Sequence, residues 1–440
     1  MDTERNPMTS RVSPPNLVIE VFDEALGKLG YVVIDRLVHG MSAGGVRWGR
    51  GTSPDELASV ARPKTYKYAF LNVPMGGAKA SIVADPHQLG CDRVTLMEAF
   101  GRSIAPLVRQ HVYDPGTDMG TTLDDLRAIM RGAGRPLAGQ QINHSFYTGL
   151  TVFETIRQLT RFNGLELTNL RVAIEGFGRV GSVVAQLLAQ AGARLIALST
   201  SRGALVAEGG LDVSRLLSLK QQYGGQLVHQ YPGAQLMTRD ALFTQHVDLL
   251  VPGARAHVIH AGNAAQVQAK LIVPIANAPV TPEAEQMLIT RGVVVMPDFV
   301  ANCGGVMAVD VWGTGFDVED ICHMVEVTFA EVVTSILQTA RREGQPVGEI
   351  ARTLAWQNYC ELNKSAPIPS NRIGRVSQVL KSQGLSGVWR RLAWRAHHRW
   401  PRLNGAIRRA AVDRYTEMTL GTTLTRVGLS HAGNSSQHTV

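Results

Sequence analysis

Hydrophobic and polar positions change their periodicity partway along the chain. The first part combines stretches at helical spacing with glycine-rich segments, whereas from about residue 145 short β-branched runs alternate with helical stretches. Strand–helix alternation of this kind is typical of a parallel sheet covered by helices on both faces. The pattern therefore predicts an α/β protein, and a length of 440 residues gives room for two domains.

The first part of the chain predicts few strands. Apolar spacing and capping signals predict helices over residues 17–29, 54–67, 93–108 and 123–130, one strand over 31–36, and loops or turns around 44–47, 75–79 and 113–122. Gly30 is expected to end the first helix, and Ser53 to cap the second. The glycine pairs at 44–45 and 76–77 are interpreted as loop and turn residues.

The second part of the chain predicts alternating elements. Strands are expected over residues 170–174, 194–198, 247–251, 271–274 and 292–295, and helices over 148–160, 181–190 and much of 317–364. We place one domain at residues 17–140, a second at 141–325, and helices that pack back on the body at 326–365. Residues 370–440 form a basic tail that is expected to be partly disordered.

One motif in the second part has a specific chemical meaning. The predicted strand that ends at Glu175 runs directly into a turn that opens a helix, made of Gly176, Phe177, Gly178, Arg179, Val180 and Gly181. In such a GxGxxG turn the first glycine permits a tight bend, the second lets a pyrophosphate approach the backbone, and the third lets the helix pack on the strand. Because plain glycine turns are common, the prediction of dinucleotide binding depends on this strand–turn–helix context.

The residues that follow the next predicted strand affect the choice between NAD and NADP. An NAD site commonly has an acidic residue there to bind the ribose 2′-hydroxyl, but residues 195–207 contain none. Thr200 and Arg202 offer a hydroxyl and a cation that suit a 2′-phosphate. We therefore expect NAD or NADP, with NADP favoured. The alternative is that Arg202 is a solvated turn residue.

Further motifs follow one another in a characteristic order. They are Gly44-Gly45-x-Arg47, Tyr66-Lys67, Pro74-Met-Gly-Gly-Ala-Lys79, Asp114-Pro-Gly-Thr-Asp118, Thr148-Gly149, Ala276-Asn277-Ala-Pro279 and Asn302-Cys-Gly304-Gly305-Val306. In order and spacing this set resembles the glutamate/leucine/phenylalanine/valine dehydrogenase family over roughly residues 20–365. The resemblance implies an N-terminal substrate-binding and dimerisation α/β domain with the catalytic lysine, a Rossmann-type NAD(P)-binding domain and C-terminal helices.

The resemblance also implies an activity, the reversible oxidative deamination of an L-amino acid to a 2-oxo acid and ammonia by a homo-oligomer. It assigns Lys67, helped by Gly44 and Gly45, to the substrate α-carboxylate. Asp118 is expected to exchange a proton with the substrate amine. Lys79, kept partly neutral by burial and by Lys67, is expected to deprotonate the attacking water. The alternative is that Lys79 and Asp118 form a structural ion pair.

Five more residues take narrower roles. By resemblance, Asn277 and Asn302 meet the substrate carboxylate or the ribose and nicotinamide of the cofactor. Thr148 and Ala254 are expected to contact the cofactor. Cys303 is either a reactive thiol or, in the interpretation that we favour, a small buried residue.

The identity of the substrate side chain follows from two positions. Glutamate-specific members have a lysine just before the first Gly-Gly pair and a serine after the second Gly-Gly-Val, where this chain has Ala43 and Val309. A carboxylate buried there would lack a partner, which is costly. Together with Gly116 and Val306, these residues predict a pocket for an apolar or aromatic side chain, closer to the leucine/phenylalanine branch. The alternatives are a glutamate dehydrogenase and a non-catalytic or regulatory homologue on the same scaffold.

Composition adds limits on location and partners. The four cysteines form no CxxC pair, which argues against a metal site or disulfide framework and favours the cytoplasm, and no apolar run reaches membrane-spanning length. The net charge of +8 comes from the tail, where 12 Lys+Arg face 2 Asp+Glu from residue 371 onward. No nucleic-acid binding is therefore expected of the body. Residues 388–400 mix tryptophan with arginine, and we favour packing on the body or on another subunit over contact with a membrane surface or nucleic acid.

Overall fold

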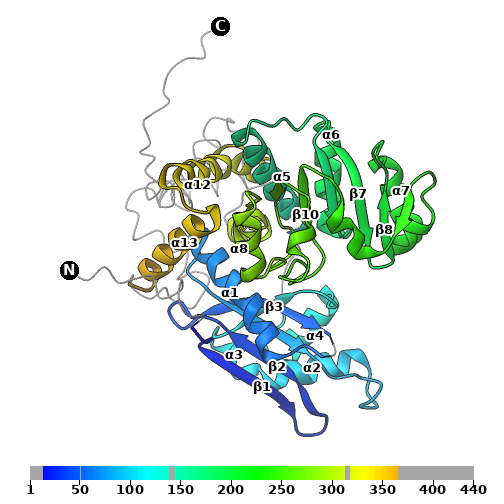
Figure 1. Cartoon of the computed structure of the whole chain (residues 1–440). Helices are drawn as coiled ribbons and strands as arrows, with labels where there is room; N and C mark the ends of the chain where they lie inside the picture. The colour runs from blue at the N-terminus through cyan, green and yellow to red at the C-terminus, as the bar shows by residue number, and fades with distance from the viewer. Residues whose placement is uncertain (1–12, 50, 138–143, 313–317, 365–440) are drawn as a thin grey trace, which may run out of the picture.

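The protein forms two lobes, each built on one β-sheet, in the computed structural model shown in Figure 1. The structure describes residues 13–49, 51–137, 144–312 and 318–364. The two-domain α/β architecture predicted from the sequence is confirmed. The first lobe contains β1 (Leu17–Asp23), β2 (Gly27–Ile34), β3 (Ser42–Trp48), α1 (Pro54–Phe70), β4 (Gly76–Ile82), α2 (Arg93–Ser103), α3 (Ala105–Arg109), β5 (Asp114–Thr117) and α4 (Leu123–Gly132).

The sheet of the first lobe has the strand order β1-β2-β4-β3-β5. Our prediction of a helix over residues 17–29 is wrong, because this segment is the β1–β2 hairpin. The Asp23 carboxylate accepts hydrogen bonds from the backbone of Ala25 and Leu26, and Gly27 turns the chain with a φ of 73°. The β-branched residues Val18 and Ile19 favour a strand once β2 is available as a partner.

The glycine pairs lie in strands and not in loops, which corrects a second prediction. Gly44 lies in β3 beside β4, where a Cβ would stand 1.5 Å from the Ala78 carbonyl oxygen. Gly77 lies in β4 under α1, where a Cβ would stand 2.2 Å from the Thr65 nitrogen. Each glycine therefore lets an element pack closely and is not needed for a turn. The expected loop at 113–122 likewise contains β5.

The second lobe has the seven-stranded sheet β12-β11-β10-β6-β7-β8-β9. Five strands, from β12 to β7, are parallel as predicted, whereas β8 and β9 add an antiparallel edge that the sequence did not predict. Its elements are α5 (His144–Phe162), β6 (Arg171–Glu175), α6 (Arg179–Gln190), β7 (Arg194–Thr200), β8 (Gly203–Val206), α7 (Val213–Tyr223), β9 (Gln235–Met237), β10 (Leu249–Pro252), β11 (Leu271–Ile272), α8 (Pro282–Thr290), β12 (Val294–Val295), α9 (Asp298–Ala301) and α10 (Gly304–Trp312).

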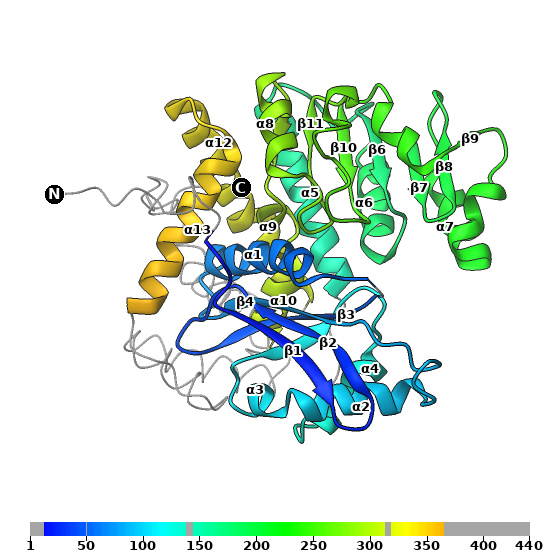
Figure 2. The ribbon, with the colours of Figure 1, turned by 60° about the horizontal axis from the view of Figure 1, so that its bottom comes forward.

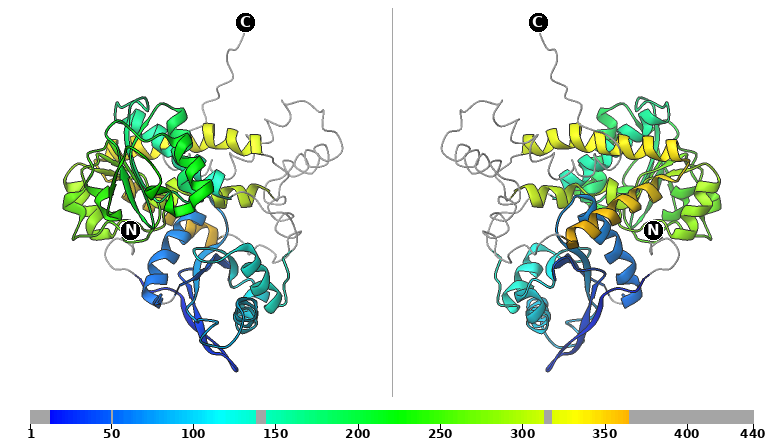
Figure 3. Two further views of the ribbon diagram at one scale, coloured as in Figure 1. Left: turned by 90° about the vertical axis from the view of Figure 1, so that its right-hand side faces the viewer. Right: turned by 90° about the vertical axis from the view of Figure 1, so that its left-hand side faces the viewer.

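The C-terminal helices return to the first lobe. They are α11 (Val318–Met324), the π-helical turn η4 (Val325–Phe329), α12 (Ala330–Glu343) and α13 (Val347–Lys364). Helix α13 packs against α1 and crosses it at an angle, as Figures 2 and 3 show. The basic tail lies outside the described residues, so the predictions made for it stay predictions. Among the helices that the structure describes, none combines the length and apolar character needed to cross a membrane.

Helix α1 joins the two lobes. Ser53 caps it, as predicted, by accepting a hydrogen bond from the backbone of Glu56. Its apolar residues Tyr66 and Phe70 belong to the hydrophobic core of the second lobe, where both rings contact Phe299. The helix therefore carries residues of the first lobe into contact with the loops that follow β11 and α9.

Candidate active site

Two lysines from different elements of the first lobe meet at the junction between the lobes. Lys79 lies in β4 and Lys67 in α1, and both residues are buried. Along β4, Lys79 alternates with Ala78 and Ala80, which belong to the core on the opposite face of the sheet. Since side chains alternate along a strand, Lys79 lies on the face that α1 covers. Sheet and helix thus bring the two cations to one place.

Lys79 forms a short ion pair with Asp118, which follows β5. The distance from Lys79 Nζ to Asp118 Oδ2 is 2.6 Å, and Arg47 Nε lies 3.7 Å from the same oxygen. Burial acts to raise the pKa of Asp118, but Lys79 and Arg47 outweigh it and hold the pKa below its ordinary value. Gly45 leaves the space for this pair, because a Cβ there would stand 2.7 Å from the Asp118 side chain. The contact is the one named by the alternative interpretation, a structural ion pair, and it is also compatible with catalytic roles for both residues.

Lys67 reaches across to the second lobe. Its Nζ donates to Asn277 Oδ1 at 3.2 Å and to the Asn302 carbonyl oxygen at 3.4 Å. Burial lowers the pKa of Lys67 to about 8, although Asp298 opposes the shift. Asp298 is itself buried, which raises its pKa, and it accepts a hydrogen bond from the Ala278 backbone. The position of Lys67 is therefore fixed by loops of the second lobe, which also contains the predicted nucleotide turn.

Asn302 has one polar atom without a partner. Its Nδ2 donates to the carbonyl oxygens of Ile275 and Ala276 and to Asn277 Oδ1. Its Oδ1 is buried and accepts no hydrogen bond from any described residue. A buried acceptor of this kind is costly unless a ligand supplies a donor. The side chain is therefore suited to bind an N–H or O–H group of a substrate or cofactor.

The predicted nucleotide turn links β6 to α6. Gly176 has a φ of 92°, and a Cβ on it would stand 2.9 Å from the Ala254 methyl group. A Cβ on Gly181 would stand 2.0 Å from the Gly176 carbonyl oxygen. Apart from its two chain neighbours, Gly178 has no atom of a described residue within 4 Å of its Cβ position, so this side of the turn is open to a ligand. Ala254 lies beside the turn, as expected of a cofactor contact.

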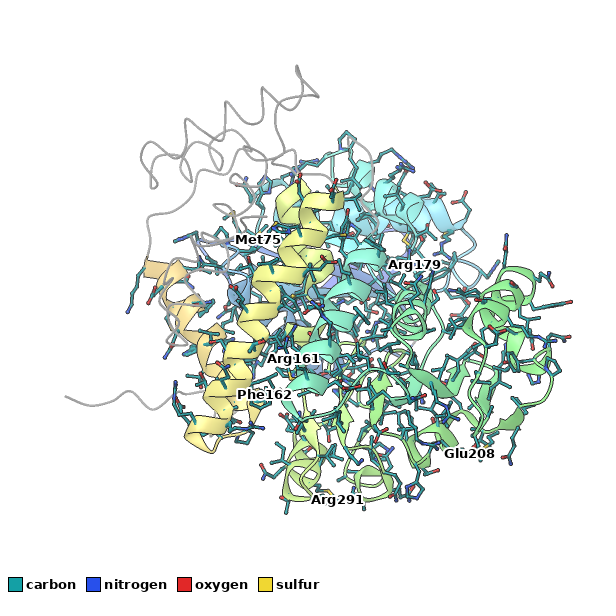
Figure 4. All side chains as sticks on the ribbon, turned by 90° about the horizontal axis from the view of Figure 1, so that it is seen from above. Met75, Arg161, Phe162, Arg179, Glu208 and Arg291 are labelled. Atoms are coloured by element: carbon teal, nitrogen blue, oxygen red, sulfur yellow. The ribbon has the colours of Figure 1, made fainter. Side chains whose placement is uncertain are left out.

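Three side chains of this turn have different surroundings. Phe177 is buried, Val180 packs on the core of the lobe, and Arg179 is exposed at the start of α6, where Figure 4 labels it. Backbone N–H groups at the start of a helix bind phosphate, and an exposed arginine adds a cation there.

Thr200 and Arg202 lie at the end of β7. Thr200 Oγ1 donates to the Gly225 carbonyl oxygen at 2.8 Å and accepts from the Arg202 nitrogen at 3.1 Å. The Arg202 side chain is exposed. Lys220 of α7 reaches the glycine turn, where its Nζ donates to the Gly178 carbonyl oxygen and to Ser182 Oγ, both at 2.8 Å. Arg202 at the end of β7 and Lys220 at the glycine turn thus add one cation each to this part of the second lobe.

The structure describes three of the four residues that are predicted to line the pocket for the substrate side chain. Ala43 in β3 is 9% exposed, and Gly116 in β5 has open space at its Cβ position. Val306 of α10 packs partly on the core. The side chain of Val309 lies outside the described residues, so its place in the pocket stays a prediction.

Cys303 and Thr148 lie near Asn302 and pack against other parts of the protein. Cys303 is buried, and burial raises the pKa of its thiol to about 12, so the interpretation as a small buried residue is confirmed. Thr148 on α5 faces Gly305, where a Cβ would stand 2.8 Å from Thr148 Oγ1. The described residues contain no group of three or more histidine, cysteine or acidic side chains that is placed to bind a metal ion.

Sequence reasoning missed three cations of the site. Arg47 was noted only as part of a motif, and Lys220 was not singled out. Lys64 was not singled out either, although burial and the charges of Lys67 and Lys79 lower its pKa. Lys64 had a signal, because it lies three residues before Lys67 in a predicted helix and therefore on the same face. Lys220 had none, since it comes from a helix distant in sequence from the glycine turn.

Two family models match this chain, one in the first lobe and one over the second lobe and the C-terminal helices. The family model for the dimerisation domain of Glu/Leu/Phe/Val dehydrogenases matches residues 24–134, and the Glutamate/Leucine/Phenylalanine/Valine dehydrogenase model matches residues 141–365. A glutamate dehydrogenase of Thermotoga maritima is 33% identical over 293 residues, which are 63% of this chain and 70% of that protein. An NADP-specific glutamate dehydrogenase of Halobacterium salinarum is 34% identical over 60% of this chain and 66% of its own.

Solved structures of amino-acid dehydrogenases share the fold of this chain. The hetero-hexameric glutamate dehydrogenase of Thermus thermophilus in its leucine-bound form is 27% identical, with a TM-score of 0.67 over 80% of this chain and 89% of that one. An L-tryptophan dehydrogenase from Nostoc punctiforme shares the fold at 23% identity and a TM-score of 0.56, over 79% of this chain and 96% of its own. The chain therefore belongs to the glutamate/leucine/phenylalanine/valine dehydrogenase family and is an amino-acid dehydrogenase.

Proposed function

We propose that the protein uses NAD or NADP to deaminate an apolar or aromatic L-amino acid oxidatively, and that it also catalyses the reverse reaction. The observation that carries the proposal is the meeting of Lys67, Lys79 and Asp118 beside loops of the nucleotide-binding lobe. A carboxylate ligand, a proton acceptor and a cofactor site are what this reaction requires of a protein. The proposed roles extend those expected from the sequence.

Lys67 binds the substrate α-carboxylate in this mechanism. Its bonds to Asn277 and Asn302 fix the ammonium group, so the substrate carboxylate is held against the nucleotide-binding lobe. Holding the reacting carbon in one orientation removes most of the entropy cost of the reaction. Gly44 and Gly45 keep the backbone of β3 free of side chains next to this position.

Asp118 and Lys79 move the protons. Asp118 accepts a proton from the substrate ammonium group, since a neutral amine is required before hydride leaves the α-carbon. The carbon–nitrogen bond then becomes an iminium. Asp118 releases its proton to the solvent and takes up the proton of Lys79, and the neutral Lys79 removes a proton from the water that attacks the iminium carbon. Loss of ammonia yields the 2-oxo acid. The 2.6 Å contact lets a proton pass between Lys79 and Asp118 after either step.

The nicotinamide cofactor, when bound, accepts the hydride from the α-carbon. The residues present fit such a group, because Gly178 is open at its Cβ position and Asn302 Oδ1 is a buried acceptor without a donor. Residues proposed to hold it are the turn Gly176–Gly181, Thr148, Ala254, Asn277 and Asn302. Thr200, Arg202 and Lys220 are proposed to favour NADP, since two cations and a hydroxyl suit a 2′-phosphate.

The choice of an apolar substrate is supported by the small residues near the site. Ala43 and Gly116 leave room next to β3 and β5 and offer no charge to a side-chain carboxylate. Val306 adds an apolar side chain from α10. A second candidate, an acidic substrate, is favoured by the relatives that are named glutamate dehydrogenases.

A homo-oligomer is proposed as well. Strand β1 is the edge of the first sheet and exposes the apolar side chains of Val18 and Phe22. The family model that matches the rest of this lobe, residues 24–134, is that of a dimerisation domain, and the Thermus relative is described as a hetero-hexamer. An exposed apolar sheet edge is suited to pair with a second subunit. The cytoplasmic location expected from the cysteines stays a prediction.

The test is reduction of NADP and of NAD, followed by nicotinamide absorbance, with L-leucine, L-valine, L-phenylalanine, L-tryptophan and L-glutamate. We expect turnover of at least one apolar amino acid, faster with NADP, and little with glutamate. Glutamate as the best substrate would overturn the apolar assignment. Silence with every amino acid, from protein that binds cofactor, would instead favour a non-catalytic homologue.

A further inference from the structure

A buried carboxylate that the proposed mechanism does not use lies next to the nucleotide turn. Glu175 is the last residue of β6, directly before the first glycine of the turn, and it is fully buried. A buried charge is costly unless it is paired and hydrogen-bonded. The Glu175 Oε1 atom accepts from Arg255 Nε at 2.8 Å. Its Oε2 atom accepts from the backbone nitrogens of Gly253 and Ala254, at 3.2 and 3.1 Å. All three partners belong to residues 253–257, the β10 loop.

The β10 loop lies between the nucleotide turn and the loop that carries Asn277. Ala254 packs against the first glycine of the turn, where a Cβ would stand 2.9 Å from the Ala254 methyl group. At the other end of the β10 loop, the backbone nitrogen of His257 donates to the Ala278 carbonyl oxygen at 2.8 Å. His257 and Ala278 have φ values of 54° and 46°, a conformation that residues other than glycine keep only where their surroundings hold it. The position of the β10 loop therefore affects both the turn and Asn277.

Arg255 compensates the charge of Glu175. Its guanidinium group is held from two sides, because Nη2 also donates to Asp240 Oδ1 at 2.6 Å. Among the described residues, Arg255 is the only cation within ion-pair distance of Glu175. Removing one partner of a buried ion pair leaves the other charge uncompensated. Loss of Arg255 would therefore leave an unpaired carboxylate under the nucleotide turn.

A bound dinucleotide brings further negative charge to this place. Its pyrophosphate lies at the backbone N–H groups of the glycine turn, which begins at the residue after Glu175. Like charges repel more strongly where water is excluded, so an unpaired Glu175 would oppose the cofactor. Arg255 cancels this charge and leaves the bonds from Glu175 to the backbone of the β10 loop in place.

We propose that Glu175 and Arg255 are positioning residues for the cofactor. Glu175 holds the β10 loop against the nucleotide turn, and Arg255 cancels the charge that would otherwise repel the pyrophosphate. The inference rests on the proposed function, because it requires the turn Gly176–Gly181 to be the cofactor site. Both residues act on the binding and orientation of the cofactor and not on the reacting atoms.

The test measures cofactor binding and stability side by side in the full chain. Nicotinamide fluorescence gives the Kd of NADPH and of NADH, and thermal unfolding gives the melting temperature. Arg255→Met is expected to raise the Kd of both cofactors at least about tenfold, because the uncompensated Glu175 repels the pyrophosphate. Both cofactors should be affected alike, since they share the pyrophosphate.

Two further variants test the charge itself. Arg255→Lys keeps a cation beside Glu175 and should bind both cofactors within about fivefold of the wild type. The double variant Glu175→Gln/Arg255→Met should restore binding to within about threefold of the wild type, because the glutamine is neutral and its amide oxygen still accepts from the β10 loop.

A second arginine–glutamate pair supplies the matched control. Arg352 pairs with Glu285 at 3.1 Å, and its side chain is 29% exposed, against 28% for Arg255. It joins α13 to α8, away from the nucleotide turn. Arg352→Met should lower the melting temperature and leave the Kd of both cofactors unchanged.

The outcomes are distinct. A lower melting temperature of Arg255→Met with an unchanged Kd would make the pair purely structural. A weakened Kd that the double variant does not restore would make Arg255 a direct ligand of the cofactor. Either result overturns the inference. If Arg255→Met does not fold, the double variant decides alone: binding near the wild-type level supports the inference, and a tenfold loss rejects it. If the wild type binds neither NADPH nor NADH, the proposed function itself fails.

Discussion

The two binding regions at the lobe junction are built by opposite means. The substrate side consists of charged side chains, Lys67, Lys79 and Asp118, which are buried or partly buried and held within hydrogen-bond distance of their partners. The nucleotide side consists mainly of missing side chains, since Gly176, Gly178 and Gly181 leave backbone exposed or closely packed. The first region should respond to changes in charge and pH, and the second to added volume.

The largest effect is expected from removing the charge of Lys79. Lys79→Ala should lower kcat by about 10²- to 10⁴-fold, because the base that activates water is lost, while the Kd of NADP stays the same. Steady-state kinetics and a fluorescence titration of the cofactor measure the two quantities. Lys270→Ala is the control for removing a lysine elsewhere. Activity within a few-fold of the wild type would make the Lys79–Asp118 contact a structural ion pair.

Added volume tests the nucleotide side. Gly178→Ala should leave the melting temperature unchanged, because no described residue beyond its chain neighbours has an atom within 4 Å of the new methyl group and the backbone φ is −78°. The methyl group should nevertheless raise the Kd of the cofactor at least about tenfold, since it fills the space of the pyrophosphate. Gly209→Ala, which is equally open but distant from the turn, is the control. Unchanged cofactor binding would place the pyrophosphate elsewhere.

A smaller effect is expected at the end of β7. Arg202→Ala should reduce the preference for NADP over NAD by about five- to tenfold, because one cation near the 2′-phosphate is lost and Lys220 remains. The kcat/KM for each cofactor gives the ratio. Arg215→Ala, on the exposed face of α7, serves as the control. If the ratio does not move, Arg202 is a solvated turn residue.

The smallest effect is a pH dependence. The pKa of Lys67 is lowered to about 8, so its charge is lost as the pH rises through that value. The affinity for 4-methylpentanoate should therefore be about twofold lower at pH 8 than at low pH, and should fall further above it. Binding measured from pH 6 to 10 gives the profile. Lys67→Arg should remove this step, because an arginine stays protonated; a step that persists in this variant belongs to another group.

The sequence predicted the second lobe better than the first. The alternation of short apolar runs with helices located β6, α6 and β7 within a few residues, because strand and helix periods differ. In the first lobe, Gly44 and Gly77 were mistaken for loop and turn residues. The reason for a glycine there is the approach of Ala78 or Thr65 from elements distant in sequence, and no local pattern contains that information. The prediction of a helix in place of the β1–β2 hairpin was wrong for the same reason, since β2 supplies the partner that makes residues 17–23 a strand.

The candidate site shows the same limit. Lys67, Lys79 and Asp118 were identified through motifs. The ion pair between Lys79 and Asp118 was one of the two interpretations of these residues. Lys220 was not identified, because its bond to the Gly178 carbonyl oxygen depends on how α7 packs beside α6. Motifs thus reveal residues that share a local spacing, whereas partners brought by packing become visible only in three dimensions.

The placement of α1 has a consequence for how the chain is made. Tyr66 and Phe70 pack on Phe299, and the Asn358 side chain of α13 donates to the Ala69 carbonyl oxygen. A ribosome completes α1 long before it reaches those partners, so the apolar face of the helix has no cover while the second lobe is being synthesised. The first lobe therefore cannot finish folding when it emerges, and Lys67 reaches its final position only after almost the whole body has been translated.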